Sequence, residues 1–568
     1  MNTRHSFMGI VVGSLVGFTA FVHPSILQLP GNSERDPQDQ EPAVIAGSVL
    51  AEVGGDPLVK ATLSLRSKTA RPQDRPRTAR TDSSGRYMFR DLEPGQYVLR
   101  ATRRGYIPRN YGQKSGDSFR RDEVGTSLTV APGQVLEDID FQLIRAGVVE
   151  GRVVDQDNEP LERVQVMLSG YRILGGERRL MPFGRDETDD RGQFRIFGIP
   201  PGTYFLSASP RPFAVMSGGA DRSFPPTYYP GVLRVEEAAT VQVAAGSEVG
   251  GFNISLIETL AYNVRGRVLT PEGKPAHSAM IMSLNDSGED IVSMMGRNTM
   301  TNLQGEFKVS GLLPGRHRLH AQAGGGEDAQ MASLTVDVVD RDLSGLTLVL
   351  GKGVQISGGI VTDQEGSDLD WRRIFVSMVP TVNIRQLSFG GSGGRVSDDF
   401  TFKISNRPEG TYRLVVRLPT GNHYVSSIRA EGQDITDRPM ELRSNDRLDG
   451  VEIHISSNGA QLSGVVEQAG KREVAAGVTV LVFAADSQHR GLHSRFTRTT
   501  QTDQRGQFTL QGLVPGEYLL CAVADHESGL ESDLDYLGSL ERDSERIDLS
   551  SGQTMEESLV ALPAPKMN

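Results

Sequence analysis

One short pattern recurs along this chain and constrains what it can fold into. Its clearest copy is Thr188–Ala208, where a Thr-Asp-x-x-Gly turn leads into an alternating segment, a Pro-Gly turn and a second alternating segment. Asp bonds nearby backbone N–H groups in turns, and Gly adopts the positive φ that tight turns need. Alternation of polar and apolar residues is typical of a half-buried strand. The pattern therefore predicts two strands joined by a tight turn.

The same pattern returns at regular places along the 568 residues. In four copies the turn glycine is followed ten positions later by the glycine of the Pro-Gly turn: Gly85 and Gly95, Gly192 and Gly202, Gly305 and Gly315, Gly506 and Gly516. A fifth copy, Asp398–Tyr412, lacks the turn glycine. Each copy follows a Gly-x-Val or Gly-x-Ile strand start, at Gly47, Gly151, Gly266, Gly358 and Gly464. Starts about one hundred residues apart match a whole small β-domain and are too long for a solenoid repeat.

This spacing predicts an all-β chain built as a tandem array of about five small β-sandwich domains. The expected repeats are 43–146 (repeat 1), 147–260 (repeat 2), 261–352 (repeat 3), 353–458 (repeat 4, the most divergent) and 459–568 (repeat 5). Before them we expect a signal peptide or N-terminal membrane anchor over 1–24 and a flexible polar linker over 25–42.

The N-terminal prediction rests on one apolar run. Phe7–Val22 follows Arg4 and His5, which is the order found in an export signal. The run is shorter than the roughly 20 residues of a membrane span, and no small-x-small cleavage site is evident. Cleaved signal and uncleaved anchor both stay open. Either way we expect an exported protein, periplasmic, at the cell surface or extracellular, with anchoring in the membrane through this segment as one alternative.

The composition favours a turn-rich chain and argues against some classes of function. The 64 glycines and 29 prolines favour many turns. The net charge of −11 argues against a general nucleic-acid binder. Cys521 is the only cysteine, so the chain forms no internal disulfide, and its apolar surroundings predict a buried core residue.

Several motifs taken together suggest a family. The Gly-x-Val start, the Asp-x-x-Asn-Glu-Pro-Leu segment at 155–161, Thr-Asp-x-x-Gly-x-Phe and Pro-Gly-x-Tyr resemble the carboxypeptidase regulatory-like domain. That family has a small transthyretin-like (prealbumin-like) β-sandwich related to pilin-B-type domains of bacterial surface proteins and to starch-binding-like folds. The resemblance is strongest in repeats 1, 2 and 5. It implies an accessory domain for folding, spacing or presentation, without catalytic residues or a cofactor.

The histidine, acidic and serine motifs of the chain have ordinary structural explanations. His489 and His493 lie near Asp486 but in a predicted loop, so a surface loop is favoured over a metal site. His317 occupies the Tyr position of the repeat, which favours packing. The acidic segment from Asp155 lacks the glycine and distal Glu of a calcium loop, which favours a turn. Gly390–Gly394 matches G-x-S-x-G by letter, but this glycine-rich loop has no strand–helix pattern around it, which favours a plain loop. We therefore predict no catalytic, cofactor-binding or metal-binding residues.

Aromatic residues in predicted loops are the candidates for ligand or partner contact, because flat rings stack on sugars and anchor protein interfaces. They are Tyr106, Tyr111, Phe224, Tyr228, Tyr229 and Trp371. The alternative is that these rings plug sandwich ends or fill junctions between repeats. The repeated Tyr97, Tyr204, Tyr412 and Tyr518 are predicted to be corner tyrosines that bond to backbone.

The resulting functional prediction is a non-catalytic surface or periplasmic protein. It would act as a structural spacer or adhesion module and contact envelope or extracellular proteins. The alternative is a carbohydrate-binding protein that holds a polysaccharide with its loop aromatics.

Overall fold

The computed structural model describes residues 42–70, 74–113, 125–210, 222–285, 298–325, 329–364, 369–381, 393–419 and 421–565. They belong to the second of two compact units, 42–568. The predicted signal or anchor and all but the last residue of the linker lie outside the described residues. Within the described part of the chain, no helix has the length and hydropathy to cross a membrane.

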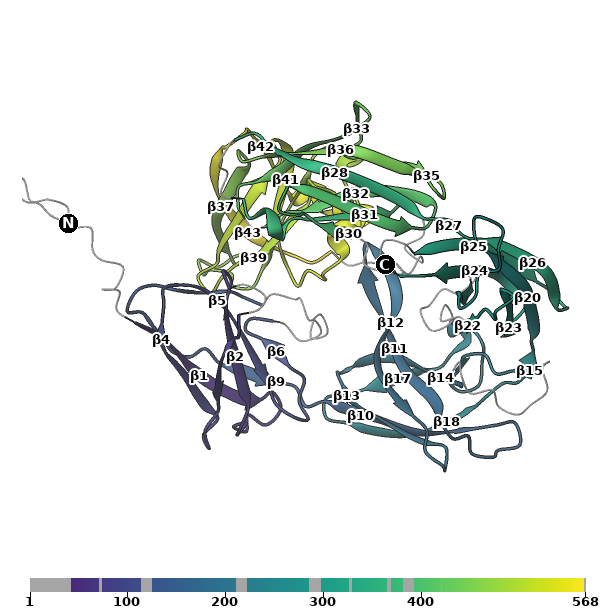
Figure 1. The fold of residues 1–568 in the computed structure, drawn as a ribbon. Helices are drawn as coiled ribbons and strands as arrows, with labels where there is room; N and C mark the ends of the chain where they lie inside the picture. Colours follow the sequence, from purple (N-terminus) through teal and green to yellow (C-terminus); the bar gives the residue numbers. More distant parts are fainter. Residues whose placement is uncertain are drawn as a thin grey trace, which may run out of the picture. The chain divides into compact units, whose positions relative to one another are not determined.

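Repeat 1 contains two sheets, ordered β4-β1-β8 with β9 also on β1, and β3-β2-β5-β6 with β7 also on β5. Figure 1 shows this repeat in purple. Its strands are β1 (Ala43–Ala51), β2 (Thr62–Ser67), β3 (Arg77–Arg80), β4 (Arg86–Leu92), β5 (Gly95–Thr102), β6 (Arg109–Asn110), β7 (Leu128–Val130), β8 (Val135–Leu136) and β9 (Phe141–Leu143).

Repeats 2 and 3 follow the same plan, with sheets β13-β10-β18 and β12-β11-β14-β16, then β23-β20-β26 and β22-β21-β24-β25-β27. Repeat 2 contains β10 (Gly147–Val154), β11 (Val164–Leu174), β12 (Glu177–Glu187), β13 (Gln193–Ile199), β14 (Gly202–Pro210), β15 (Arg222–Ser223), β16 (Thr227–Tyr228), η2 (Val235–Glu237), β17 (Thr240–Val243), β18 (Glu248–Ser255) and β19 (Thr259–Leu260). Repeat 3 contains β20 (Tyr262–Leu269), β21 (Met280–Asn285), β22 (Asn298–Met300), β23 (Glu306–Leu312), β24 (Gly315–Ala323), β25 (Gln330–Val338), β26 (Leu343–Val349) and β27 (Gly351–Lys352).

Repeats 4 and 5 are more elaborate. The sheets of repeat 4 are ordered β31-β28-β36-β33-β34 and β30-β29-β32-β35. Its elements are β28 (Val354–Thr362), η4 (Trp371–Arg373), β29 (Phe375–Pro380), β30 (Gly393–Arg395), β31 (Thr401–Arg407), β32 (Gly410–Arg417), β33 (Tyr424–Ala430), β34 (Gln433–Asp434), β35 (Met440–Leu442) and β36 (Arg447–Ser456). Repeat 5 contains β37 (Ala460–Glu467), β38 (Thr479–Ala484), η5 (Ser487–His489), β39 (Arg498–Gln501), β40 (Gln507–Leu513), β41 (Gly516–Ala524), η6 (Leu530–Ser532), α2 (Leu534–Leu540), η7 (Glu541–Asp543), β42 (Glu545–Leu549) and β43 (Thr554–Pro563).

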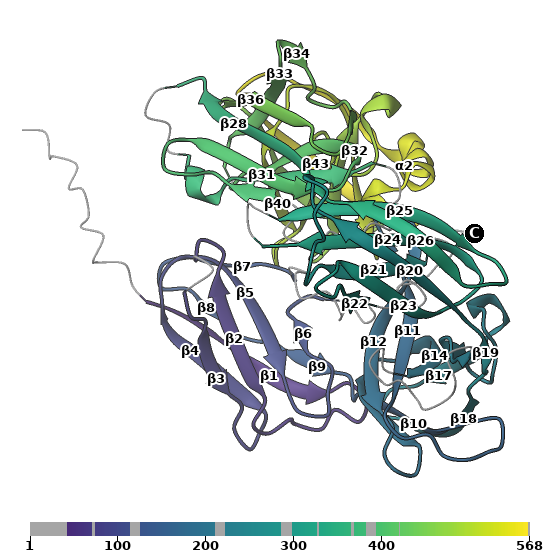
Figure 2. The same ribbon diagram turned by 45° about the vertical axis from the view of Figure 1, so that its right-hand side comes forward.

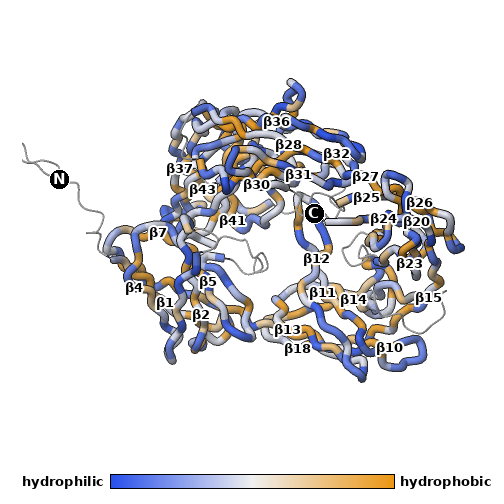
Figure 3. Tube along the Cα trace, in the orientation of Figure 1, coloured by the Kyte–Doolittle hydropathy of each residue, from blue (hydrophilic) through white to orange (hydrophobic). Residues whose placement is uncertain are grey.

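In every repeat the first strand pairs with its neighbours in the same way. It pairs antiparallel with the strand after the turn motif and parallel with the closing strand, as β10 does with β13 and β18. Each repeat has a main cluster of apolar side chains, and repeats 2 and 5 each have a second, smaller one. In repeat 1 the cluster includes Ile45, Leu63, Phe89 and Leu99. Polar and apolar residues accordingly alternate along many strands (Figure 3). The predicted fold, an all-β tandem array of β-sandwiches, is confirmed; the limits between repeats stay our proposal.

The Gly-x-Val start has a steric cause. The closing strand makes a register shift opposite the glycine in repeats 2, 3 and 4, for example between Val149 and Gly151. A Cβ on Gly151 would lie 2.1 Å from the carbonyl oxygen of Phe252 and 2.6 Å from the Phe194 ring. A glycine lets the backbone and the aromatic ring approach this closely.

The side chains of the Thr-Asp pair in the motif make hydrogen bonds to backbone groups of the same repeat. Buried Thr188 accepts from Val164 N–H at 2.9 Å and donates to Leu161 C=O at 2.6 Å. The Asp189 carboxylate accepts from the N–H groups of Arg191 and Gln193. The same bonds are made from Thr81 and Asp82, Thr301 and Asn302, and Thr502 and Asp503.

Repeat 4 departs from this turn. Its strand pairing places Val396 and Ser397 where the other repeats have Thr and Asp, and Phe400 where they have glycine. Phe400 keeps the left-handed backbone, with φ +62°, close to the +71° to +73° of the four glycines. A large L-residue is strained in this region.

Repeat 5 carries an addition after β41. The segment from η6 to η7, with α2 labelled in Figure 2, covers the outer face of β38, whose six residues are all buried. This explains why β38 is continuously apolar instead of alternating. Cys521 is 2% exposed within the same cluster, so the prediction of a buried core cysteine agrees with the structure.

Candidate functional site

The aromatic insertion of repeat 2 lies in the protein interior. Tyr228, on β16, is 1% exposed and packs with Leu180 and Val235. Its N–H donates to Val232 C=O at 2.7 Å. The expectation that Tyr228 presents its ring to a ligand is therefore contradicted, because neighbouring strands cover it.

The two companions of Tyr228 also face the core of repeat 2. Phe224 and Tyr229 are partly buried against its main cluster. The Tyr229 ring meets Phe252 edge to face, with centroids 5.3 Å apart. Packing, the alternative considered for these rings, accounts for their positions.

Tyr106 and Tyr111 are half-buried against the core of repeat 1. Tyr111 packs edge to face on Phe141, with centroids 5.9 Å apart. Burial raises the pKa of the Tyr111 hydroxyl, and the nearby carboxylate of Asp140 raises it further. Both rings therefore close one side of this sandwich, and neither is brought together with the other predicted aromatics.

Trp371 is partly buried against the core of repeat 4 and lies beside an exposed ring. It begins η4, and its ring lies 5.5 Å from that of Phe400, which is 48% exposed. The guanidinium of Arg372 stacks over Trp371 at 4.6 Å and is 3.4 Å from Asp398. Sequence reasoning missed Phe400, although the absence of glycine from this turn was a usable signal.

The histidine and carboxylate candidates serve local structure. His489 is 3.7 Å from Asp486 and packs on Phe496. Asp155 Oδ1 accepts from the N–H groups of Asp157 and Glu159, which is a turn cap and not an open ligand set. Among the described residues, no three His, Cys, Asp or Glu side chains gather as a metal site would require.

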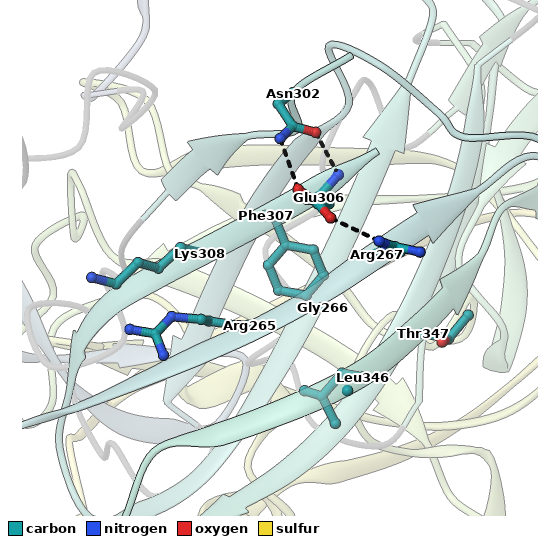
Figure 4. A pocket seen from close by; sticks show the side chains of 10 residues that line it. Arg265, Gly266, Arg267, Asn302, Glu306, Phe307, Lys308, Leu346 and Thr347 are labelled. Atoms are coloured by element: carbon teal, nitrogen blue, oxygen red, sulfur yellow. Dashed lines mark hydrogen bonds and ion pairs between the residues drawn. The ribbon is translucent and has the colours of Figure 1, made fainter. Parts of the chain in front are cut away.

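An open hollow of about 640 Å³ lies over the sheet β23-β20-β26 of repeat 3 (Figure 4). Glu306 lies at its rim and bonds to Arg267 at 2.8 Å and to Asn302 at 3.1 Å. Both bonds lower the pKa of Glu306, and the bond to Arg267 has the larger effect. Glu306 is therefore ionised at neutral pH, and a carboxylate held in this way does not act as a general acid.

Comparison with family models bears on the repeated sandwich. The model of the carboxypeptidase regulatory-like domain matches residues 44–144 and 263–351. These two segments are similar to carboxypeptidase regulatory-like domains. They correspond to repeats 1 and 3, so the recognition is confirmed, although repeat 3 had the weaker motif. A second model, the second β-sandwich domain of BOS complex subunit NOMO1-like proteins, matches residues 457–528 in repeat 5.

Curated relatives are similar over part of the chain. BOS complex subunit NOMO1 of Mus musculus is 22% identical over 323 residues, which are 56% of this chain and 22% of the relative. Serine-aspartate repeat-containing protein F of Staphylococcus epidermidis is 29% identical over 136 residues, which are 22% of this chain and 8% of the relative. The chain thus spans about a fifth or less of the length of these relatives.

Solved structures with some likeness include several pilins. The Bacillus anthracis TIE protein has 10% identity and a TM-score of 0.15, with 73% of this chain and 74% of that chain covered. The minor pilin GBS52 of Streptococcus agalactiae has 16% identity and a TM-score of 0.22, with 39% and 96% covered. At these TM-scores the neighbours establish neither a common arrangement nor a function.

Proposed function

We propose that this chain is a non-catalytic, exported structural protein whose β-sandwich repeats space or present contacts to envelope or extracellular proteins. One observation carries the proposal: the polar residues that recur in the repeats are used by the fold itself. The side chains of Thr188 and Asp189 together make four hydrogen bonds within repeat 2. A repeated motif that leaves no repeated reactive group free is typical of a scaffold.

The relatives support the protein-contact part of this proposal. NOMO1 is named as a subunit of a complex, and serine-aspartate repeat-containing protein F is named for its repeats. Carboxypeptidase regulatory-like domains are named as regulatory and not as catalytic modules. The export part rests on the Phe7–Val22 run.

The test is performed in the source cells with the full chain carrying a C-terminal tag. Fractionation and protease accessibility should place the repeats outside the cytoplasm. In-cell crosslinking should give the same discrete adducts in repeated preparations. Retention of the tagged chain in the cytoplasm, or the absence of any adduct from a folded, exported sample, would contradict the proposal.

A second candidate function, carbohydrate binding, is favoured by the exposed Phe400 beside Trp371. Aromatic faces of this kind stack on sugar rings. Purified full chain should then be retained on one polysaccharide of a panel, and Phe400→Gly should release it. Tyr229→Phe is the matched control, because it removes a hydroxyl and keeps the packed ring. Equal retention of the parent and Phe400→Gly would exclude this site.

A further inference from the structure

The turn of repeat 5 is buried at a place where the turns of other repeats are exposed. Asp503 is 5% exposed, whereas the residues at its place in repeats 1, 2 and 3 are exposed: Asp82, Asp189 and Asn302. All four side chains accept the same backbone N–H bonds, from residues two and four positions ahead. The local turn is therefore the same, and the difference in exposure comes from a distant segment.

That segment is β7 of repeat 1. The backbone N–H of Thr129 donates to Gln504 Oε1 at 3.1 Å, and Gln504 Nε2 donates to the C=O of Thr129 at 2.9 Å. The hydroxyl of Thr129 donates to Asp503 Oδ2 at 3.0 Å. β7 pairs with β5 on one side and is an outer strand of its sheet. The amide of Gln504 thus makes the two bonds that a neighbouring strand would otherwise make with Thr129.

The side chains that meet here are complementary, and the other repeats do not carry the same set. Thr129 offers a hydroxyl to Asp503, whereas the strands paired in the same register elsewhere carry one amide and three acids: Gln242, Asp337, Glu441 and Asp548. A carboxylate at this place would repel Asp503. The other turns have no amide at the place of Gln504, where they carry Ser83, Asp190, Leu303 and Asp398. A hydroxyl on the strand and an amide in the turn therefore match once in the array.

Contacts on both sides of Thr129 extend this meeting surface. Arg505 Nη2 donates to Gln134 Oε1 at 3.1 Å. Gly477 of repeat 5 comes so near to repeat 1 that a Cβ on it would lie 2.8 Å from Thr126 Oγ1. The surface on repeat 1 therefore reaches from Thr126 to Gln134.

A bare strand edge offers its backbone groups to any extended segment, and folded proteins commonly cover such edges. We propose that the turn 502–506 of repeat 5 docks on the β7 edge of repeat 1 in the same chain and so withholds this edge from other segments. Because both repeats belong to one chain, the turn is present at a high effective concentration. The contact is made by polar groups at the surfaces of two separate sandwiches, so it opens without unfolding either of them. This inference does not depend on the proposed function.

Crosslinking at the border of the contact tests whether the two repeats meet within one chain. Gln134→Cys and Arg505→Cys are combined in the full chain, which leaves the bonds to Thr129 intact. A short bis-maleimide should join the two cysteines within one chain, with a yield that does not depend on protein concentration. The native Cys521 is 2% exposed, so it does not compete in the folded chain. The matched control is Gln134→Cys with Arg191→Cys, which should give no intrachain product, since Arg191 holds the place of Arg505 in the exposed turn of repeat 2.

Hydrogen exchange measures whether Gln504 protects the edge. The N–H of residue 129 should exchange about fivefold faster or more in Gln504→Ala, because loss of one net hydrogen bond changes an opening equilibrium by roughly this factor. Asp190→Ala is the matched control and should leave this exchange unchanged, because Asp190 holds the same place in the exposed turn of repeat 2. If Gln504→Ala does not fold, Thr129→Val replaces it, since valine removes the hydroxyl that bonds to Asp503.

The outcomes separate a contact within the chain from one between chains. An intrachain product from the first cysteine pair, together with faster exchange in the variant, supports the proposal. Products that join two chains and grow with concentration, without an intrachain product, overturn it and make a second copy the occupant of the edge. No product from a folded sample, the same yield from the control pair, or unchanged exchange in the variant also overturns it.

Discussion

The imidazole Nε2 of His317 lies 2.7 Å from the carbonyl oxygen of Leu313, four residues earlier in the chain. In the other repeats a tyrosine hydroxyl donates to the carbonyl four residues back, from Tyr97, Tyr204, Tyr412 and Tyr518. An imidazole N–H thus replaces a phenol O–H in repeat 3. The predicted corner tyrosines are confirmed, and His317 performs their role as well as packing.

This relationship predicts how repeat 3 responds to substitution. His317→Phe should lower the free energy of unfolding by about 1 kcal/mol, because the donor to Leu313 is lost. His317→Tyr should cost less, because the hydroxyl reaches the same carbonyl. Hydrogen exchange of peptides from β23 and β24 in urea measures the local effect. Equal loss in both variants would mean that ring shape, and not the hydrogen bond, matters.

The strand-start glycine predicts a steric effect in repeat 2. Gly151→Ala should destabilise by about 3 kcal/mol, because its Cβ would meet the Phe252 carbonyl oxygen at 2.1 Å. Gly250→Ala is the matched control, since its Cβ would find its nearest neighbour, Glu150, at 3.9 Å. That variant should stay within about 0.5 kcal/mol of the parent. Urea unfolding followed by hydrogen exchange of β10 and β18 compares the two.

We expect the stability of repeat 4 to tolerate removal of the exposed Phe400 ring. Phe400→Gly should change the free energy of unfolding by less than about 1 kcal/mol, because relief of the left-handed backbone offsets the lost contact with Trp371. Phe402→Ala, at a position 2% exposed, should cost about 3–5 kcal/mol. Denaturant titration of both variants measures the contrast. A loss from Phe400→Gly as large as that from Phe402→Ala would show that the Phe400 ring is part of the core.

The single thiol predicts a pH effect. Burial raises the pKa of Cys521 to about 11. At pH 8 roughly 0.1% of native molecules would carry the reactive thiolate, so disulfide reagents should modify the folded chain far more slowly than the urea-unfolded chain. Comparable rates in both states would contradict the burial of this thiol.

The same shift affects stability with a definite sign. The folded pKa lies above the unfolded value of about 8.5. The stability that comes from keeping the thiol protonated is therefore complete below pH 8.5 and is lost as the pH rises towards 11. Urea midpoints of the parent should fall over this range more than those of Cys521→Ala. Parallel curves for the two proteins would contradict the shift.

Much of the fold was predictable because its determinants are local. The turn at Asp189 bonds to N–H groups two and four residues ahead, and the tyrosine corner bonds four residues back, so each leaves a fixed spacing in the sequence. The spacing of the strand starts indicated the number of sandwiches. The candidate site was less predictable, since Tyr228 and Phe400 are both aromatics near turns and only one is exposed.

The sequence by itself determined the β-class and the repeated turn and corner bonds, because these follow from period-two alternation and from bonds between near neighbours. Tertiary structure alone decided that Tyr228 is enclosed and that Phe400 stands beside Trp371. The physical reason is that exposure and charge compensation depend on which distant segment covers a residue, and no local pattern encodes that partner.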